Sequence, residues 1–341
     1  MPAPAQSSPV SAQTDGCGDP GAPVAPGFGE QAAGSFGERL AARVRARESQ
    51  IVLGLDPDPM ALWPGVHAPA AGSAAQRAAG AVAVHCRALI DAAGPACVAV
   101  KPQLARFEAL GAPGWDALRA VVEHARAAGL LVIADGKRGD IDVTARAYAT
   151  ALMGSLPTPF GEIEGLGVDM ATVNPLLGAD AIEPFVAVAR AAGAGVLLLV
   201  RTSNPGGADV QDAELAGGGL VWERLARLVD ALGVDERERG SLGDQRGGLA
   251  DVGAVIGATE PAHLVRAREL MPRAVFLLPG VGAQGGRVED LAPAFAPGRA
   301  GGLIAASRSI AAAHEAAGGD PASAARAEAE RLRELAWSVS S

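Results

Sequence analysis

GLLVIADGKRGDIDVT, residues 129–144, places an apolar run directly before a group of charged residues. The run from Leu130 to Asp135 is nearly continuous in apolar side chains, as expected of a strand that is buried on both faces of a parallel sheet. The charged residues lead into an Ala- and Arg-rich segment, for which we expect a helix. The stretch therefore predicts one unit of strand followed by helix.

The same order of strand and helix repeats along the whole chain. We expect eight strands, each of them a short apolar or β-branched run followed by a helical stretch. Their ranges are Ile51 to Leu55, Ala96 to Lys101, Leu130 to Asp135, Asp169 to Asn174, Val196 to Val200, Val252 to Ile256, Ala274 to Leu278 and Gly302 to Ala305. Eight such units in about 300 residues predict an α/β fold, the closed (β/α)8 or TIM barrel, for which about 250 residues are usual.

The first part of the chain has a different composition. Residues 1–34 are rich in Pro, Ala, Gly, Ser and Gln and hold almost no large apolar side chains. Such a segment cannot bury enough surface to offset the entropy of ordering it, so we expect a disordered extension. The spacing of Phe36, Leu40 and Val44 predicts a short helix before the first strand. We therefore expect a single catalytic domain over residues 35–341.

Composition excludes several classes of protein. The 341 residues carry 29 Lys and Arg against 38 Asp and Glu, a net charge of −9, which argues against binding to nucleic acid or to an anionic membrane. No apolar run is long enough to span a membrane. The three cysteines form no CxxC pair and the five histidines show no ligand spacing, so we expect a reducing cytoplasm and no metal site.

Lysine is rare in this chain, and its two positions are informative. Only Lys101 and Lys137 are lysines, whereas 27 basic residues are arginines. A coding bias explains the scarcity but not the positions, which lie at or just beyond the ends of two predicted strands. The active site of a (β/α)8 barrel lies at these ends. Because an ammonium is compact and can release a proton, which a guanidinium does not do, the two lysines indicate chemistry.

The segment around Lys137 has the form DxKxxDIxxT. Asp135 and Lys137 are two residues apart and can project to the same side, and Asp140 follows at the start of the next helix. We expect the ammonium to lie between carboxylates that keep it charged, which favours a proton donor and a stabiliser of negative charge over an amine nucleophile. The alternative is a solvated charged turn that opens a helix.

A glycine-rich loop, PGVGAQGG at residues 279–286, follows the seventh predicted strand. It also reads as GxGxxG, but a dinucleotide site needs an acid at the next strand exit, and residues 305–308 contain none. A phosphate cradle fits better, because small residues let backbone N–H groups approach an anion. Gln284 adds an amide donor and Arg308 a charged fork. The expected substrate-binding residues here are Pro279, Gly280, Gly282, Gln284, Ser307 and Arg308. The alternative is a plain tight turn.

Two further strand exits carry polar residues. Asp56 ends the first strand and could accept hydrogen bonds from sugar hydroxyls, although a turn aspartate before proline would look the same. Thr202 and Ser203, in the segment RTSNP, offer hydroxyls that could read the polar edge of a base. Taken alone, that segment predicts only a turn.

Together these motifs resemble the orotidine 5′-phosphate decarboxylase family, in particular its longer divergent bacterial branch. The resemblance runs from about Ser35 to Ile310. It rests on an ordered set: aspartate at the first strand exit, lysine at the second, DxKxxDIxxT at the third, PGVGAQGG at the seventh and SRSI at the eighth. The segments VKPQ at residues 100–103 and TVNP at residues 172–175, which contains Asn174, are also similar to that branch.

The resemblance implies decarboxylation of orotidine 5′-phosphate to UMP and CO2, the last step of de novo pyrimidine nucleotide synthesis, with no cofactor. It implies a catalytic array of Lys137, Asp135, Asp140 and Lys101. Substrate contacts are then expected from Asp56 to the ribose, from Gln284 and Arg308 to the phosphate, and from Thr202 or Ser203 to the pyrimidine; Asn174 is a further candidate. It also implies a homodimer in which Asp140 and Thr144 reach the partner's site.

The residues alone leave three other functions open. A metal-dependent keto-sugar-phosphate decarboxylase or synthase of the same barrel superfamily has a similar DxKxxD, but an acid in the place of Lys101. A Schiff-base aldolase needs a neutral amine, which the acids near Lys137 disfavour. A non-catalytic sensor of a phosphate ligand would keep Gln284 and Arg308 but has no need of the two lysines. Residues 207–253 could form a lid or a plain insertion.

Overall fold

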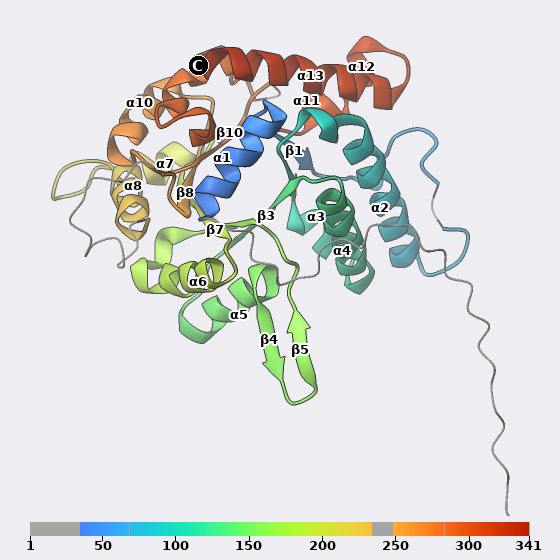
Figure 1. Ribbon diagram of the computed structural model, residues 1–341, viewed down its shortest axis with the longest axis horizontal. Helices are drawn as coiled ribbons and strands as arrows, with labels where there is room; N and C mark the ends of the chain where they lie inside the picture. Colours follow the sequence, from blue (N-terminus) through green and yellow to red (C-terminus); the bar gives the residue numbers. More distant parts are fainter. Residues whose placement is uncertain (1–34, 68, 234–247, 283, 341) are drawn as a thin grey trace, which may run out of the picture. The chain divides into compact units, whose positions relative to one another are not determined.

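Eight parallel strands close into a barrel in the computed structural model, which describes residues 35–67, 69–233, 248–282 and 284–340 (Figure 1). The strands are β1 (Ile51–Leu55), β2 (Ala99–Pro102), β3 (Leu131–Arg138), β6 (Met170–Val173), β7 (Gly195–Arg201), β8 (Val252–Ile256), β9 (Phe276–Pro279) and β10 (Gly302–Ala306). Around the barrel they follow the order β1-β10-β9-β8-β7-β6-β3-β2. The predicted fold is confirmed.

All eight predicted strands are present, and two of them differ from their predicted bounds in ways that matter. β2 begins three residues later than expected, because Gly94–Ala96, with its proline, forms the short 3-10 helix η1. β3 continues three residues beyond Asp135, as far as Arg138. Lys137 therefore belongs to the strand itself and not to the loop that follows it.

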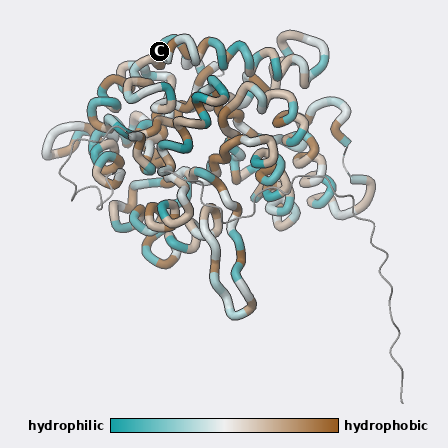
Figure 2. Tube along the Cα trace, viewed as in Figure 1, coloured by the Kyte–Doolittle hydropathy of each residue, from teal (hydrophilic) through white to brown (hydrophobic). Residues whose placement is uncertain are grey.

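Side chains alternate between two hydrophobic cores along each barrel strand, as the two-residue period of a strand requires. One core fills the barrel and includes Val52, Ala99, Ile133, Met170 and Leu197. The next residue along each of these strands belongs to the other core, which lies between the barrel and its helices. Figure 2 shows the hydrophobic stretches gathered along the central strands. This alternation fixes which residues at the strand ends point into the barrel.

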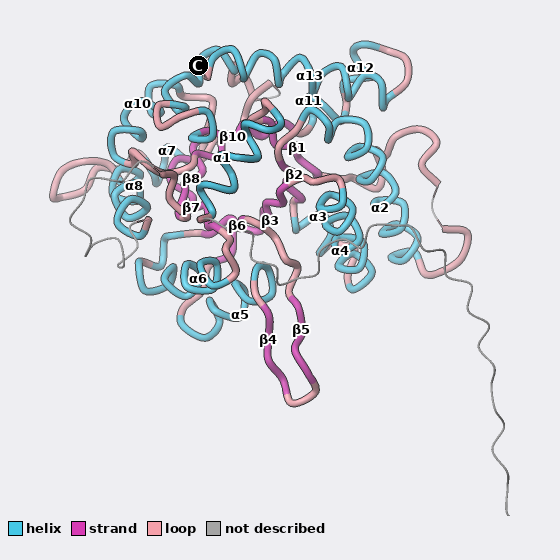
Figure 3. The backbone as a smooth tube through the Cα atoms, in the orientation of Figure 1, coloured by secondary structure: helices cyan, strands magenta, loops and turns pink. Residues whose placement is uncertain are grey.

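Helices surround the strands (Figure 3). The α-helices are α1 (Phe36–Arg47), α2 (Ala74–Ala93), α3 (Leu104–Glu108), α4 (Ala112–Ala127), α5 (Asp142–Met153), α6 (Ala179–Ala191), α7 (Gly207–Gln211), α8 (Val221–Leu232), α10 (Pro261–Leu270), α11 (Arg308–Ala311), α12 (Ala313–Ala317) and α13 (Pro321–Val339). Three further 3-10 helices in the described residues are η2 (Pro175–Leu177), η3 (Val288–Phe295) and η4 (Arg299–Gly301). Serine capping boxes at Ser35 and Ser73 begin α1 and α2.

The helix α1 closes the end of the barrel at which the strands begin. Phe36, Leu40 and Val44 are buried and belong to the core inside the barrel. The predicted amphipathic helix before the first strand is therefore confirmed, and the open end of the barrel is the opposite one, where the strands end.

One element was not predicted. β4 (Ser155–Thr158) and β5 (Gly161–Glu164) form an antiparallel hairpin after α5, outside the barrel. Figure 1 shows it projecting away from the strands and helices. Leu156 pairs with Ile163, and both side chains are more than half exposed, as is the tip residue Phe160.

Some predictions fall on residues outside the described part. The expected disorder of residues 1–34 lies there, and so do residues 234–247 of the segment predicted as a lid or an insertion. The described part of that segment contains α7 and α8. Among the described helices, none is both long enough and apolar enough to cross a membrane.

Candidate active site

The alternation of side chains brings three polar residues of neighbouring strands into the open end of the barrel. Lys101 lies two residues after Ala99, Asp135 two after Ile133 and Thr172 two after Met170, and the earlier residue of each pair points into the barrel core. All three polar residues are buried. Buried polar groups need hydrogen-bond partners. Lys101 and Thr172 both donate to Asp135, and Thr172 also accepts the backbone N–H of Lys137.

Asp135 lies between the two lysines of the chain. Lys101 Nζ is 2.7 Å from Asp135 Oδ2, and Lys137 Nζ is 2.5 Å from Asp135 Oδ1. The side chains of Lys101 and Asp135 are each 9% exposed, whereas that of Lys137 is 44% exposed. Lys137 is therefore the lysine that faces the open end, and Lys101 is the buried one.

Two neutral groups complete the surroundings of the carboxylate. Thr172 Oγ1 donates to Asp135 Oδ1 at 3.1 Å, and Gln103 Nε2 donates to Oδ2 at 3.4 Å. Burial alone would raise the pKa of Asp135, but the charges and hydrogen bonds of Lys101 and Lys137 outweigh burial and lower that pKa to about 2. Asp135 is consequently ionised at neutral pH.

Lys137 is held by an irregularity in its strand. Between the pairs Ala134↔Ala171 and Arg138↔Val173, four steps along β3 match two steps along β6, so β3 bulges. Lys137 has φ 46°, a left-handed conformation that is uncommon for a residue with a side chain. Its backbone N–H donates to Thr172 Oγ1 at 2.9 Å. Thr172 thus contacts both Asp135 and the backbone that carries Lys137.

The predicted place of Lys137 between two acids differs from the observed one. Within the single chain, Lys137 contacts Asp135, whereas Asp140 Oδ1 accepts the N–H of Ile141 at 2.8 Å at the start of α5. Thr144 lies in the first turns of α5 and is exposed. The spacing of the motif brings Asp135 and Lys137 together but places Asp140 just before α5 and Thr144 within it.

Asp56 follows β1 and is linked to the last strand of the barrel. Ser307 Oγ, directly after β10, donates to Asp56 Oδ2. The two strands approach closely here, since a Cβ on Gly54 would lie 2.5 Å from Ser307 Cβ. Asp56 and Ser307, predicted from separate motifs, are therefore neighbours at the open end.

The glycine-rich loop lies beside the residues that follow β10. Gly280 and Gly282 have φ 104° and 74°, values that glycine adopts readily because it has no Cβ. A Cβ on Gly280 would lie 3.0 Å from Gln284 Oε1, and one on Gly282 would lie 3.4 Å from Ser309 Cβ. In the described part of the chain, Arg308 is exposed and forms no ion pair. The loop, with Gln284, thus lies next to Ser309, the residue after Arg308, and a phosphate site here would need a cationic side chain of this kind.

Thr202 and Ser203 follow β7 and differ in how their hydroxyls are used. Thr202 Oγ1 is 2.7 Å from Asn204 Oδ1, and Gln211 Nε2 donates to it at 3.0 Å. The Ser203 hydroxyl has no hydrogen-bond partner among the described residues, and a Cβ on Gly280 would lie 3.2 Å from Ser203 Cβ. Ser203 therefore faces the glycine-rich loop with a free hydroxyl.

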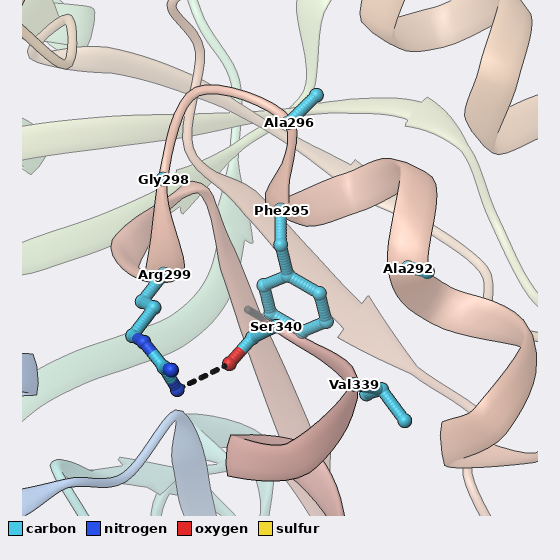
Figure 4. Close-up of a pocket in the computed structure, with 7 residues that line it drawn as sticks. All are labelled: Ala292, Phe295, Ala296, Gly298, Arg299, Val339 and Ser340. Carbon is cyan, nitrogen blue, oxygen red and sulfur yellow. Dashed lines mark hydrogen bonds between the residues drawn. The ribbon is translucent and has the colours of Figure 1, made fainter.

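Other candidates have different positions. Asn174 is the N-cap of η2, and its Oδ1 accepts the N–H of Leu176 at 3.0 Å. Pro279 is the last residue of β9. The pocket in Figure 4 is lined by residues of η3, η4 and the end of α13, including Arg299 and Ser340, and contains none of the predicted site residues.

Sequence reasoning missed several residues of the site. Thr172 and Gln103 were not predicted to contact Asp135, although Thr172 is polar at an inward position of an otherwise apolar strand, which is a usable signal. Ser309 was also missed: its Oγ is buried without a hydrogen-bond partner in the described structure, next to Gly282. Ser309 is part of the SRSI motif, but the sequence alone does not indicate that its hydroxyl is buried without a partner.

The chain is similar to known proteins over most of its length. Residues 49–327 match the sequence model of the orotidine 5′-phosphate decarboxylase / HUMPS family. Orotidine 5′-phosphate decarboxylase of Deinococcus radiodurans is 47% identical over 222 residues, which cover 65% of this chain and 74% of that protein. The enzyme of the same name from Rhodopirellula baltica is 39% identical over 284 residues, which cover 82% and 89%.

A solved structure is similar over most of its length. OMP decarboxylase of Leishmania donovani superposes with a TM-score of 0.63 at 29% sequence identity, and the match covers 89% of this chain and 99% of that one. The likeness thus extends beyond the motifs to the whole barrel. The chain belongs to the orotidine 5′-phosphate decarboxylase / HUMPS family.

Proposed function

We propose that Lys137 supplies the positive charge and the proton for the reaction that this chain catalyses, the decarboxylation of orotidine 5′-phosphate to UMP and CO2, which completes de novo pyrimidine nucleotide synthesis. The observation that carries the proposal is the array of Lys101, Asp135 and Lys137 at the open end of the barrel, with Lys137 as its exposed member.

Decarboxylation at C6 requires a positively charged group that can also donate a proton. When the bond between C6 of the pyrimidine and its carboxylate breaks, the electron pair stays on C6, where no carbonyl is placed to accept it. A fixed positive charge next to C6 stabilises this carbanion. Lys137 Nζ then gives a proton to C6, which yields UMP and a neutral amine that regains its proton from solvent. The proposed steps use protein groups only.

Asp135 has two roles in this proposal. Its carboxylate accepts hydrogen bonds from both ammonium groups and so fixes their positions. Because its pKa is lowered to about 2, the carboxylate stays negative beside the substrate's own carboxylate. The repulsion disfavours the bound substrate and is relieved when CO2 leaves.

The ends of the substrate are assigned to separate groups. We assign the phosphate to Gln284, Arg308 and the glycine-rich loop, and the ribose hydroxyls to Asp56 and the buried Lys101. Binding energy from the phosphate, which lies remote from C6, can be used to close the site and exclude water. For the pyrimidine edge we assign Ser203, because Thr202 already has two hydrogen-bond partners.

We assign Asp140 and Thr144 to the active site of a second copy, in a homodimer. Two observations support this assignment. Within one chain Asp140 does not contact Lys137, and the start of α5 carries exposed apolar residues, with Ile141 57% and Val143 72% exposed. An apolar face of this kind is typical of an interface.

Lys137→Ala tests the proposal. We expect loss of orotidine 5′-phosphate, followed by ultraviolet absorbance, to slow by more than roughly 10⁴-fold, because both charge stabilisation and proton transfer are removed. Binding of UMP, measured by calorimetry, should persist. Near-normal turnover by this variant would refute the role of Lys137.

The same assay separates the metal-dependent alternative within the superfamily. Wild-type turnover should be equal with and without a chelator, since the proposed steps involve no metal. Loss of turnover in the chelator, restored by a divalent cation, would favour keto-sugar-phosphate chemistry, and a direct assay with a keto-sugar phosphate would then decide.

A further inference from the structure

Arg138, the residue after Lys137, joins three elements around the bulge in β3. Its Nη2 forms an ion pair with Glu108 Oε1 at the end of α3, and its Nη1 donates to the carbonyl of Gly136, inside the bulge, at 3.2 Å. Its guanidinium carbon lies 5.6 Å from the ring centroid of Tyr148 in α5. One side chain therefore contacts the helix after β2, the bulge itself and the helix after β3.

The bulge needs support from its surroundings. A left-handed conformation is unfavourable for a residue with a side chain, so Lys137 keeps φ 46° only if its neighbours impose it. On one side of Lys137, Gly136 is packed so closely that a Cβ there would lie 2.7 Å from Leu104 Cδ1. On the other side, Arg138 pairs with Val173, and its carbonyl accepts the N–H of Asn174 at 2.7 Å.

Glu108 extends this support to the strand that carries the other lysine. It ends α3, which starts directly after Gln103, and Gln103 donates to Asp135. The ion pair thus ties the segment after Lys101 to the segment after Lys137. The Arg138 and Glu108 side chains are only 22% and 31% exposed, so solvent screens the pair less than it screens a pair on the open surface.

We propose that the ion pair between Glu108 and Arg138 is a positioning clamp that holds the bulge of β3 and thereby fixes Lys137 Nζ against Asp135. Neither residue is assigned to contact the substrate, and both act through Lys137. The proposal rests on the proposed function, in which Lys137 stabilises and protonates C6.

Such a clamp should affect the chemical step more than binding. The phosphate is assigned to groups that follow β9 and β10, and the ribose is assigned to Asp56 after β1 and to Lys101 on β2. Neither Glu108 nor Arg138 forms a hydrogen bond or ion pair with any of these residues in the described structure. A displaced ammonium, in contrast, loses both its distance and its direction to C6, and a shift of about 1 Å can cost up to about 100-fold in rate. The expected signature is a lower kcat with little change in substrate binding.

The test compares two carboxylates that each bind an arginine. Glu108→Ala removes the clamp. Asp251→Ala is the matched control, because Asp251 accepts two hydrogen bonds from Arg190, at 2.6 and 3.1 Å. The Asp251 side chain is 23% exposed and that of Arg190 is 30% exposed. Asp251 lies directly before β8, at the other end of the barrel. Glu108→Asp keeps the carboxylate and serves as the conservative variant. Steady-state kinetics, UMP calorimetry and thermal unfolding are measured on all three.

We expect Glu108→Ala to lower kcat by at least about tenfold, with KM and UMP affinity changed less than about threefold. Asp251→Ala should leave kcat within about twofold of wild type, even if its melting temperature falls as much as that of Glu108→Ala. Glu108→Asp should regain most of the lost kcat. If Glu108→Ala does not fold, Glu108→Gln, which keeps the size of the side chain, takes its place under the same limits.

Three results would overturn the clamp: an unchanged kcat in Glu108→Ala, an equal fall in Asp251→Ala, or a Glu108→Asp variant no more active than Glu108→Ala. Each of them leaves the role of Lys137 intact, because that role is decided separately by Lys137→Ala. Failure of the clamp and failure of the proposed function are therefore distinguishable.

Discussion

Each oxygen of the Asp135 carboxylate faces one lysine, and Thr172 and Gln103 donate to the same two oxygens. Within one chain, Asp135 therefore lies between two lysines, whereas the second acid expected near Lys137 is Asp140, which we assign to the site of a second copy. The rarity of lysine identified both ammonium groups from the sequence. It could not show that they meet on one carboxylate, because that contact depends on the closure of β2 against β3 and on the bulge, which no local pattern encodes.

The lowered pKa of Asp135 predicts a contribution to stability that depends on pH. The folded value of about 2 lies below the ordinary 3.8, so the unfolded chain binds the proton more tightly, and stability rises with pH. The contribution, about 2 kcal/mol, is complete above pH ~4 and is lost as pH falls towards 2. In urea unfolding, the advantage of wild type over Asp135→Asn should shrink by about that amount over this range. A constant difference would contradict the prediction.

Ser203→Ala is predicted to weaken substrate recognition. Removing a free hydroxyl that is assigned to the pyrimidine edge should raise KM by roughly tenfold, the effect of about 1.4 kcal/mol, and leave the melting temperature unchanged. Thr202→Val is the contrasting variant: it breaks the hydrogen bonds to Gln211 and Asn204 and should lower stability as well. A larger KM effect from a stably folded Thr202→Val than from Ser203→Ala would reverse the assignment.

At the scale of elements, short apolar runs were sufficient to predict every barrel strand. A strand buried on both faces needs a nearly continuous apolar run, and each of the eight predicted ranges has one. The hairpin of β4 and β5 lacks that signal, because its strands have four residues each and mix Leu156 and Ile163 with proline and acids. The extension of β3 to Arg138 was not predicted for the same reason: the last residues of this strand are mostly polar and do not continue the apolar run.

Close approach between neighbouring strand exits predicts the effect of one glycine. A Cβ on Gly257, directly after β8, would lie 2.7 Å from Ser203 Cα and 2.9 Å from Ser203 N, and backbone atoms cannot move aside easily. Gly257→Ala should therefore displace Ser203, cost about 1–3 kcal/mol of stability and raise KM. Gly217→Ala, where nothing lies within 4 Å, is the control and should be nearly silent. Equal kinetics in the two variants would contradict this placement of Ser203.

At the scale of the whole molecule, one chain does not complete the array that the family resemblance implies. Asp140 and Thr144 lie at the start of α5, beside the exposed Ile141 and Val143. The family resemblance predicts that these two residues are shared between subunits, which stays a prediction, and it does not predict how a single chain presents them. That depends on where α5 begins after the bulge, and so on the tertiary structure.

Mixing two inactive variants tests the shared site. Asp140→Ala and Lys137→Ala should each be nearly inactive alone. In a heterodimer one site combines an intact Lys137 with an intact Asp140 from the other subunit, so an equal mixture that exchanges subunits freely should regain about a quarter of wild-type turnover. Absence of recovery, with heterodimers demonstrated by native mass spectrometry, would contradict the sharing of Asp140.

The unequal exposure of the two lysines provides a means of counting functional sites. Apart from any terminal amine, an acylating reagent for primary amines has two targets in this chain: Lys101, 9% exposed, and Lys137, 44% exposed. The first side chain to be acylated should therefore be Lys137, at one label per competent subunit, and saturating UMP should shield it. Intact mass spectrometry would then report occupancy without any turnover assay.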